Sequence, residues 1–216
     1  MVVWYKRFFY KYIGTNSEFY LWYLINMILH PKAVYETSRY QFSLTQQWHR
    51  RDHSITKLIV LINIIIVILY GLTFVSPLAF IPYVLWSIIA PLLVGVILST
   101  VLYYIVNSLF TTGDVFTVRY SYDINNNAYL CYMFIARIVV YILSPILFQQ
   151  GLFVTFVSNL IQLFAILYYI YVTYLGYAIL PFIQIPKKAV IIPMSIMCIF
   201  VGIMTLCNYN IGLLWI

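Results

Sequence analysis

Long runs of apolar residues, separated by short polar breaks, fill the last three quarters of the chain. A run of about 18 residues or more is long enough to cross a bilayer as a helix. Only Ser76 and Pro77 separate the first two runs, so these should form a tight antiparallel hairpin. The second run is long and contains Pro82 and Pro91, which predicts either an interfacial start or a tilted and kinked helix. We predict five membrane-spanning helices, at residues 58–75, 78–106, 128–147, 152–180 and 189–206.

The chain before the first span has a different pattern. Placed on a helix, residues 2–12 put their aromatic side chains on one arc and their basic side chains on the other. A second apolar run, residues 19–29, contains Asn26, ends before Pro31 and is too short to cross a bilayer. We predict two amphipathic interfacial helices here. The second helix could instead pack on the membrane bundle.

Residues 31–57 are polar, with four aromatic side chains spaced among charges. This is the longest stretch expected to lie in water, and so the longest surface available for recognition. We therefore divide the chain into a cytosolic and interfacial segment, residues 1–57, and a five-helix transmembrane domain, residues 58–216.

The fourth span ends in a tyrosine-rich stretch, residues 168–182. Tyrosine hydroxyls are costly in bare hydrocarbon, so this end should lie at the membrane interface or against neighbouring helices. Gly176 and Ala178 leave room for the close approach of another helix, and Pro181 removes a backbone donor where the helix would end. An aromatic belt at a wet helix end would explain the same residues.

Composition supports the same class of protein, since 64% of the residues are hydrophobic and 8% are charged. A soluble domain with this balance would have too little polar surface. The predicted fold class is therefore an all-α membrane protein, with five transmembrane helices preceded by amphipathic interfacial helices. The net charge of +7 does not indicate nucleic acid, because 8 of the 12 Lys and Arg lie in residues 1–57, beside the spans.

Positive charge outside the spans falls on one side of the predicted membrane. Arg119 lies in the loop between the second and third spans, and Lys187 and Lys188 lie in the loop between the fourth and fifth. Five spans place both loops on the same side as the basic N-terminal segment. The partition is 11 positive charges against none, which predicts a cytosolic N-terminus and a lumenal or extracellular C-terminus.

Polar side chains inside the spans each need a partner or water. Arg137 carries the one charge found within the predicted spans. It could mark a transport path, but an arginine without an intramembrane acid is a poor relay. It could instead snorkel, or bond to carbonyl groups and to Asn159 or Gln162. The intramembrane polar set is Asn63, Arg137, Asn159 and Gln162.

The sequence shows no Gly-rich phosphate loop, nucleophile elbow or spaced Cys/His set, so we predict no enzyme activity, no catalytic residue and no cofactor. His49, Asp52 and His53 suggest a metal site, but two arginines lie between the histidines and no Cys or Glu completes a ligand shell. We predict no metal. Asp123, followed by Asn125 to Asn127, predicts the N-terminal cap of the third span.

Three separated stretches resemble the signature blocks of one family, the uncoordinated-fifty family of Golgi membrane proteins. They are HPKAVYETSRYQFSLTQQWHRRD, RYSYDINNNAY and YYIYVTYLGYAILPF, at residues 30–52, 119–129 and 168–182. The resemblance implies five spans, a cytosolic N-terminus and residence in the Golgi or endoplasmic reticulum membrane. It also implies a role in trafficking of assembled cell-surface receptors and in recruiting exchange factors of ADP-ribosylation-factor GTPases.

The resemblance and the predicted topology together suggest one partner-binding face on the cytosolic side. Trp48 and Arg50 would be its strongest contacts, because aromatic residues and arginine dominate protein interfaces. Alternatively, Trp48 anchors in the headgroups and Arg50 pairs with Asp52. The predicted partners are membrane lipids, exchange factors and receptor cargo. The matched residues in this set are Tyr35, Tyr40, Gln47, Trp48, Arg50, Asp52, Tyr120, Asp123, Tyr177 and Pro181.

A different class of function is a small transporter or lipid-handling protein that uses the polar residues around Arg137. A cavity that reaches Arg137 would favour this class, whereas a packed bundle with cytosolic grooves would favour a trafficking scaffold.

Overall fold

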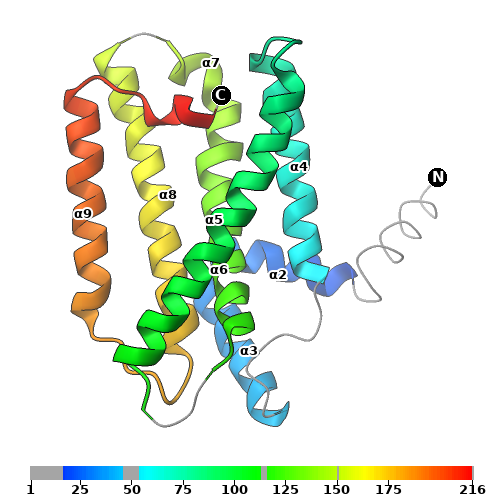
Figure 1. The fold of residues 1–216 in the computed structure, drawn as a ribbon, viewed down its shortest axis with the longest axis vertical. Helices are drawn as coiled ribbons and strands as arrows, with labels where there is room; N and C mark the ends of the chain where they lie inside the picture. The colour runs from blue at the N-terminus through cyan, green and yellow to red at the C-terminus, as the bar shows by residue number, and fades with distance from the viewer. Residues whose placement is uncertain (1–16, 46–53, 113–115, 150, 216) are drawn as a thin grey trace.

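The computed structural model describes residues 17–45, 54–112, 116–149 and 151–215. Within these residues, five helices are long and apolar enough to cross a membrane, as the sequence predicts. Consecutive spans run antiparallel to each other (Figure 1). The helices are α2 (Ser17–Leu29), α3 (Pro31–Thr45), α4 (Ser54–Phe74), α5 (Phe80–Leu109), α6 (Val118–Met133), the π-helix η1 (Phe134–Val139), α7 (Val140–Leu147), α8 (Leu152–Ala178), α9 (Lys187–Leu206) and the 3-10 helix η2 (Ile211–Trp215).

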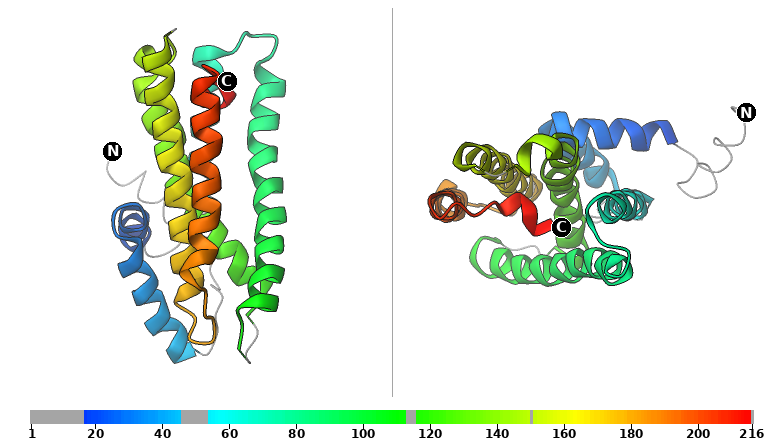
Figure 2. Two further views of the ribbon diagram at one scale, coloured as in Figure 1. Left: turned by 90° about the vertical axis from the view of Figure 1, so that its left-hand side faces the viewer. Right: turned by 90° about the horizontal axis from the view of Figure 1, so that it is seen from above.

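The third span is the centre of the bundle. It consists of α6, η1 and α7, which together form one continuous helix over Val118–Leu147. In its most apolar window 44% of the residues are buried inside the protein, against 11% for α5 and 6% for α9. Seen from above, the other spans surround it (Figure 2). The outward faces of α5 and α9 are therefore available to lipid.

The third span begins ten residues earlier than the sequence predicts, and the predicted cap at Asp123 is wrong. Helix α6 starts at Val118, and the side chain of Thr117 accepts a hydrogen bond from the Tyr120 amide at 3.4 Å. Asp123 lies within the second turn of the helix. The apolar run starts at Ala128 because the preceding residues of α6 contact other helices rather than lipid.

Helix α5 is the longest element, with 30 residues. At 1.5 Å per residue it is about 45 Å long, which exceeds a hydrocarbon thickness of about 30 Å. It runs obliquely across the bundle (Figure 1), so tilt accommodates the extra length. Pro91 lies inside the helix, as predicted.

Helix α2 packs on the bundle and also exposes an apolar face. Met27 is fully buried and its carbonyl oxygen accepts a hydrogen bond from Cys131 Sγ at 3.3 Å. On the other side Trp22, Ile25 and Leu29 are exposed. The helix lies across the spans, level with the start of α4 (Figure 1). Packing of this segment on the bundle is therefore confirmed, and its position at the membrane interface stays a prediction.

The polar segment that follows α2 is helical, although its sequence pattern did not predict a helix. Pro31 occupies the first turn of α3, where its missing N–H costs nothing. The His30 carbonyl oxygen accepts hydrogen bonds from the amides of Ala33 and Val34 at 3.0 and 3.4 Å. Helix α3 continues to Thr45 and packs against α8.

Basic residues mark one end of the bundle, which we call the basic end. Lys57 lies near the start of α4, and Lys187 and Lys188 begin α9. Helices α5 and α8 finish at this end, and α3 lies there too (Figure 1). At the opposite end the C-terminal segment with η2 lies across the bundle (Figure 2).

We predict that the basic end is cytosolic. In sealed vesicles from expressing cells, a protease-accessible tag placed before Met1 should be cleaved, and a tag placed after Ile216 should be protected, because positive charge outside the spans is retained in the cytosol. Immunoblotting with and without detergent measures both tags. Cleavage of both tags in intact vesicles would be incompatible with five spans.

Candidate functional site

Three segments that are far apart in sequence meet at the basic end. A Cβ atom at Gly176 on α8 would lie 2.8 Å from two side-chain carbons of Ile124 on α6, and 3.0 Å from the hydroxyl oxygen of Tyr35 on α3. The absence of a side chain at Gly176 is what permits this approach. The Tyr120 hydroxyl also donates to the Gly176 carbonyl oxygen at 2.7 Å. We call Tyr35, Tyr120, Ile124, Gly176 and Tyr177 the three-helix junction.

Tyr177 connects the junction to α5. Its buried hydroxyl pairs with the hydroxyl of Ser121, and Ser121 Oγ is 2.6 Å from the Ser99 carbonyl oxygen on α5. The ring of Phe116 packs against the rings of Tyr120 and Tyr177, with centroid distances of 6.1 and 5.7 Å. The junction is therefore a packed aromatic core with buried hydroxyl groups.

Tyr35 brings a buried hydroxyl to the junction from α3. Burial raises its pKa well above the usual value, and the nearby Tyr23 raises it further, so the phenol is neutral. The nearby Asn127 side chain acts in the opposite direction and lowers that pKa, but no described residue gives the hydroxyl a hydrogen bond of ordinary geometry. The side chain thus fixes α3 by packing.

A loop next to the junction is held by backbone hydrogen bonds. The Thr112 amide donates to the Phe182 carbonyl oxygen at 2.9 Å, and the Gln184 amide donates to the Phe110 carbonyl oxygen at 3.0 Å. Phe182 is buried, whereas Pro181 is exposed. The end of the tyrosine-rich stretch therefore presents a fixed surface at the basic end.

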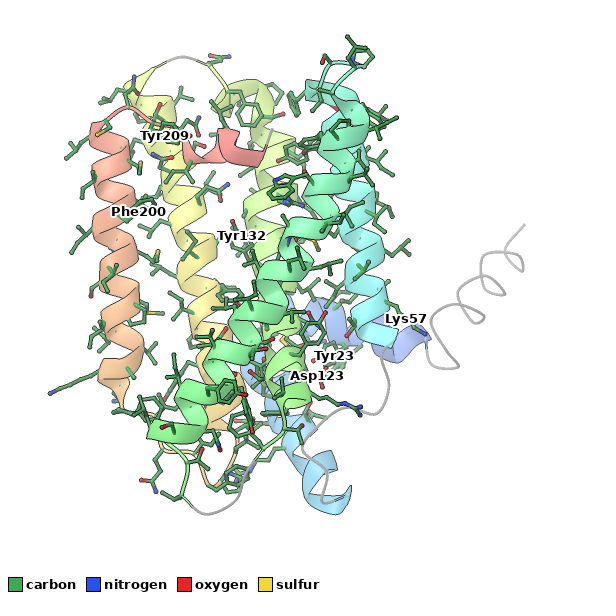
Figure 3. All side chains as sticks on the ribbon, viewed as in Figure 1. Tyr23, Lys57, Asp123, Tyr132, Phe200 and Tyr209 are labelled. Atoms are coloured by element: carbon green, nitrogen blue, oxygen red, sulfur yellow. The ribbon has the colours of Figure 1, made fainter. Side chains whose placement is uncertain are left out.

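The structure brings together the described members of the predicted partner-binding set. Tyr35, Tyr120 and Tyr177 are buried, so they hold the helices together. Asp123, labelled in Figure 3, is half-buried. It lines a small hollow together with Tyr35 and Tyr120. Asp123 and Pro181 are thus the members with surface that a partner could contact.

The other members of that set cannot be placed. The backbone of Tyr40 belongs to α3, but its side chain is not among the described ones. Gln47, Trp48, Arg50 and Asp52 lie outside the described residues, as does the histidine pair considered for a metal. Within the described residues, no group of His, Cys, Asp or Glu could hold a metal ion.

The tyrosine-rich stretch packs mainly against protein. The Tyr168 hydroxyl donates to the Ile28 carbonyl oxygen at 2.7 Å, and the Tyr169 hydroxyl donates to Asn125 Oδ1 at 2.5 Å. Tyr171 is exposed. Contact with neighbouring helices, rather than an aromatic belt alone, accounts for this sequence.

The four intramembrane polar residues are all buried, and none exceeds 3% exposure. Arg137 Nη1 donates to Asn63 Oδ1 at 2.7 Å, which also accepts from the Tyr129 hydroxyl at 3.1 Å. Gln162 Nε2 donates to the Ala136 carbonyl oxygen at 3.1 Å. Asn159 bonds to the C-terminal segment. Contacts with other helices and with the C-terminal segment therefore give these groups partners.

A cleft of about 370 Å³ reaches Arg137 from the side of the bundle. Helix α5 contributes Trp86 and Val94 to its lining, and α8 contributes Ile166. The third span contributes Tyr132, which is labelled in Figure 3. A cavity that reaches Arg137 is the feature that would point to the lipid-handling class. Its walls are mainly apolar, and its polar groups come chiefly from the third span.

The interface between α6 and its neighbours includes three residues that were not predicted from the sequence, namely Ser121, Ile124 and Asn125. All are buried, and Asn125 Nδ2 also lies 3.0 Å from where a Cβ of Gly95 on α5 would be. Their spacing with Ala128 is that of one helical face. Reading residues 118–127 as a helix would have revealed this face.

Comparison with known proteins identifies one family and several relatives that carry its name. The model of a protein family, described as the UNC-50 family, matches residues 5–216. The protein named unc-50 homolog in Dictyostelium discoideum is 27% identical over 190 residues, covering 83% of this chain and 73% of that protein. Protein unc-50 of Caenorhabditis elegans is 28% identical over 174 residues, covering 78% and 58%. Protein unc-50 homolog of Homo sapiens is 27% identical over 190 residues, covering 83% and 72%. No solved structure matches the chain.

Proposed function

Since the chain belongs to the UNC-50 family, we propose that it is a non-enzymatic membrane protein of the Golgi or early secretory pathway that supports vesicle trafficking. It promotes delivery of membrane receptors to the cell surface by recruiting exchange factors of ADP-ribosylation-factor GTPases. The names of the matched family and relatives refer to no enzyme activity.

The observation that supports this proposal is the three-helix junction. The three stretches that resemble the family blocks lie far apart in sequence, yet parts of all three pack together at the basic end. A packed junction fixes the positions of the exposed residues around it, among them Pro181 and Arg119. A rigid surface binds a partner at a lower entropic cost than a flexible one.

The proposal predicts that charge removal beside the junction weakens capture of exchange factors. Arg119 and Lys187 both lie exposed in the first turn of a spanning helix at the basic end, but only Arg119 belongs to a family-like stretch. We expect Arg119→Ala to reduce affinity capture in mild detergent, and Lys187→Ala to leave it unchanged. Trp48→Ala and Arg50→Ala should each weaken binding by about 2 kcal/mol, or roughly thirtyfold.

Golgi retention, followed by microscopy, is the control for these variants. If all of them are retained in the Golgi and capture exchange factors like the wild type, recruitment through this face is wrong. Equal losses in Arg119→Ala and Lys187→Ala would indicate a general effect of positive charge.

The cleft supports a second candidate function, which is the handling of a membrane lipid. It reaches from the lipid-facing side of α5 to the buried Arg137, and it does not involve the three-helix junction. Movement of a labelled lipid between vesicle leaflets, measured with and without reconstituted protein, tests this function separately from recruitment.

A further inference from the structure

The cleft between α5 and α8 has two chemically different sides. The α5 side is apolar, and its residues Trp86 and Val94 are 70% and 60% exposed, so this side opens toward lipid. The inner side is formed by polar residues of the third span, including Asn125, Tyr129 and Tyr132. An apolar opening with a polar inner wall suits an amphiphile, which has both kinds of surface.

A π-helix turns Arg137 into this cleft. Asn125, Tyr129 and Tyr132 are spaced four and three residues apart, so they share one face of α6. A continued α-helix would place residue 136 next on that face. The π-helix Phe134–Val139 has i→i+5 hydrogen bonds and so accommodates one extra residue per turn, which brings Arg137 onto the face instead.

The packing around the π-helix keeps it in place. The Tyr70 hydroxyl on α4 donates to the Arg137 carbonyl oxygen at 2.9 Å, and Gln162 on α8 donates to the Ala136 carbonyl oxygen at 3.1 Å. These two side chains satisfy carbonyl groups of the widened turn. The guanidinium itself is oriented by its bond to Asn63. π-Turns of this kind occur frequently at functional sites.

The charge of the cleft selects the kind of head group. Arg137 is the one charged residue among those described as lining the cleft. A guanidinium binds a carboxylate through two parallel hydrogen bonds, and a carboxylate is a very small acidic head group. The cleft therefore favours an anionic head close to Arg137.

The size and depth of the cleft select the rest of the ligand. A volume of about 370 Å³ is at the low end of sites that hold one small ligand, which fits one hydrocarbon chain better than two. Along the third span, Arg137 is about ten residues from Leu147 at one end. In the other direction it is about as far from Asn126, whose Nδ2 donates to Thr56 Oγ1 at the start of α4. Each separation corresponds to roughly 15 Å along the helix. A bulky phospholipid head group would have to leave the interface to reach it.

We propose that the cleft binds one long-chain fatty acid, with the carboxylate at Arg137 and the chain between α5 and α8. This inference is independent of recruitment at the three-helix junction. It names a ligand for the second candidate function, lipid handling. The two share the same cleft, but ligand binding does not require that the protein moves lipid. Binding without any lipid movement would refute the candidate function and leave the site intact.

Direct binding to the full chain tests the site. Purified, delipidated protein in detergent is titrated with radiolabelled palmitic acid and, separately, with radiolabelled hexadecanol, which has the same chain length and a neutral head. We expect saturable binding of one palmitic acid per chain and at least tenfold weaker binding of hexadecanol. Arg137→Gln should weaken palmitic acid binding roughly tenfold or more, and Arg137→Lys should weaken it less, because it keeps the positive charge.

A second pair of variants leaves Arg137 unchanged. Val94 and Ile97 are both on α5 and are 60% and 62% exposed, but only Val94 lines the cleft. Val94→Trp should block palmitic acid binding by filling the cleft, whereas Ile97→Trp should bind like the wild type. This pair decides the question if Arg137→Gln does not fold.

Several results would overturn the proposal. They are no saturable palmitic acid binding by the wild-type protein, equal affinity for hexadecanol, and unchanged binding in a folded Arg137→Gln or Val94→Trp variant. A co-purified phospholipid that competes with palmitic acid for the cleft would replace the fatty acid as its ligand.

Discussion

Replacing Gly176 by alanine should destabilise the protein by about 1–3 kcal/mol, the usual cost of overpacking a close-packed core. The added Cβ would lie 2.8 Å from two carbons of Ile124 and 3.0 Å from the Tyr35 hydroxyl oxygen. Ile124 is branched at Cβ and therefore stiff, so relief requires a shift of α6 or α3 against α8. For a chain of this size, each 1 kcal/mol lowers the unfolding temperature by about 2–4 °C.

Gly202 provides a matched control for this substitution. It lies within α9, is exposed, and a Cβ there would meet nothing within 4 Å. Alanine favours a helix over glycine by up to about 1 kcal/mol, so Gly202→Ala should be neutral or slightly stabilising. Thermal unfolding in the same detergent compares the two variants. The junction is wrongly described if Gly176→Ala unfolds at or above the temperature of Gly202→Ala.

A double-mutant cycle locates the clash. Ile124→Ala removes both of the carbons that a Cβ at Gly176 would meet. It leaves a cavity on its own, which typically costs about 2–5 kcal/mol. Because the new methyl group of Gly176→Ala partly fills that cavity, the double variant should be more stable than the sum of the two single effects predicts. If the changes in the free energy of unfolding add exactly, the cost of Gly176→Ala does not come from contact with Ile124.

Replacing Asn159 by leucine should release the C-terminal segment from the bundle. Asn159 is fully buried, its Nδ2 donates to Thr205 Oγ1 at 3.0 Å and to the Tyr209 carbonyl oxygen at 2.9 Å, and its Oδ1 accepts from the Ile211 amide at 2.8 Å. Leucine has a similar size but satisfies none of these groups. Each buried polar group left without a partner costs about 1–3 kcal/mol.

Hydrogen exchange measures this release directly. The amides of Tyr209 to Leu213 should exchange roughly tenfold faster or more in Asn159→Leu, since 1.4 kcal/mol corresponds to a factor of ten in local opening. Gln162→Leu is the matched control, because Gln162 is equally buried on α8 but bonds to Ala136 in the centre of the bundle. It should leave exchange in the C-terminal segment unchanged. Equal protection in wild type and Asn159→Leu would contradict the anchoring role.

The two residues also show how far prediction from sequence extends. Polar residues inside apolar runs identified Asn159 and Gln162 as groups that need partners, because an unsatisfied amide is costly in a membrane. Their partners lie 46, 50 and 52 residues away for Asn159 and 26 residues away for Gln162. A single sequence contains no signal that relates such positions, so the partners were not predictable.

For the candidate site too, the sequence indicated which residues matter but not which residues they contact. The resemblance of three stretches to one family suggested that they act together, and Gly176 indicated a close helix approach. The contacts of Gly176 with Ile124 and Tyr35 depend on how α3, α6 and α8 are placed. The helical character of residues 31–45 was missed because few of its residues are apolar, and its stability comes from packing on α8.

What the sequence by itself determined is the number and order of the five spans and their approximate ends, except for the start of the third. The reason is that each span follows from the length of one apolar run compared with the thickness of a bilayer. The tertiary structure alone decided that α6 continues to Val118 and that a π-turn directs Arg137 into the cleft. The hydrogen bond from Arg137 joins residues 74 positions apart, and one widened turn changes which face a residue occupies. Both effects arise from packing between helices, which hydrophobic periodicity along one chain does not record.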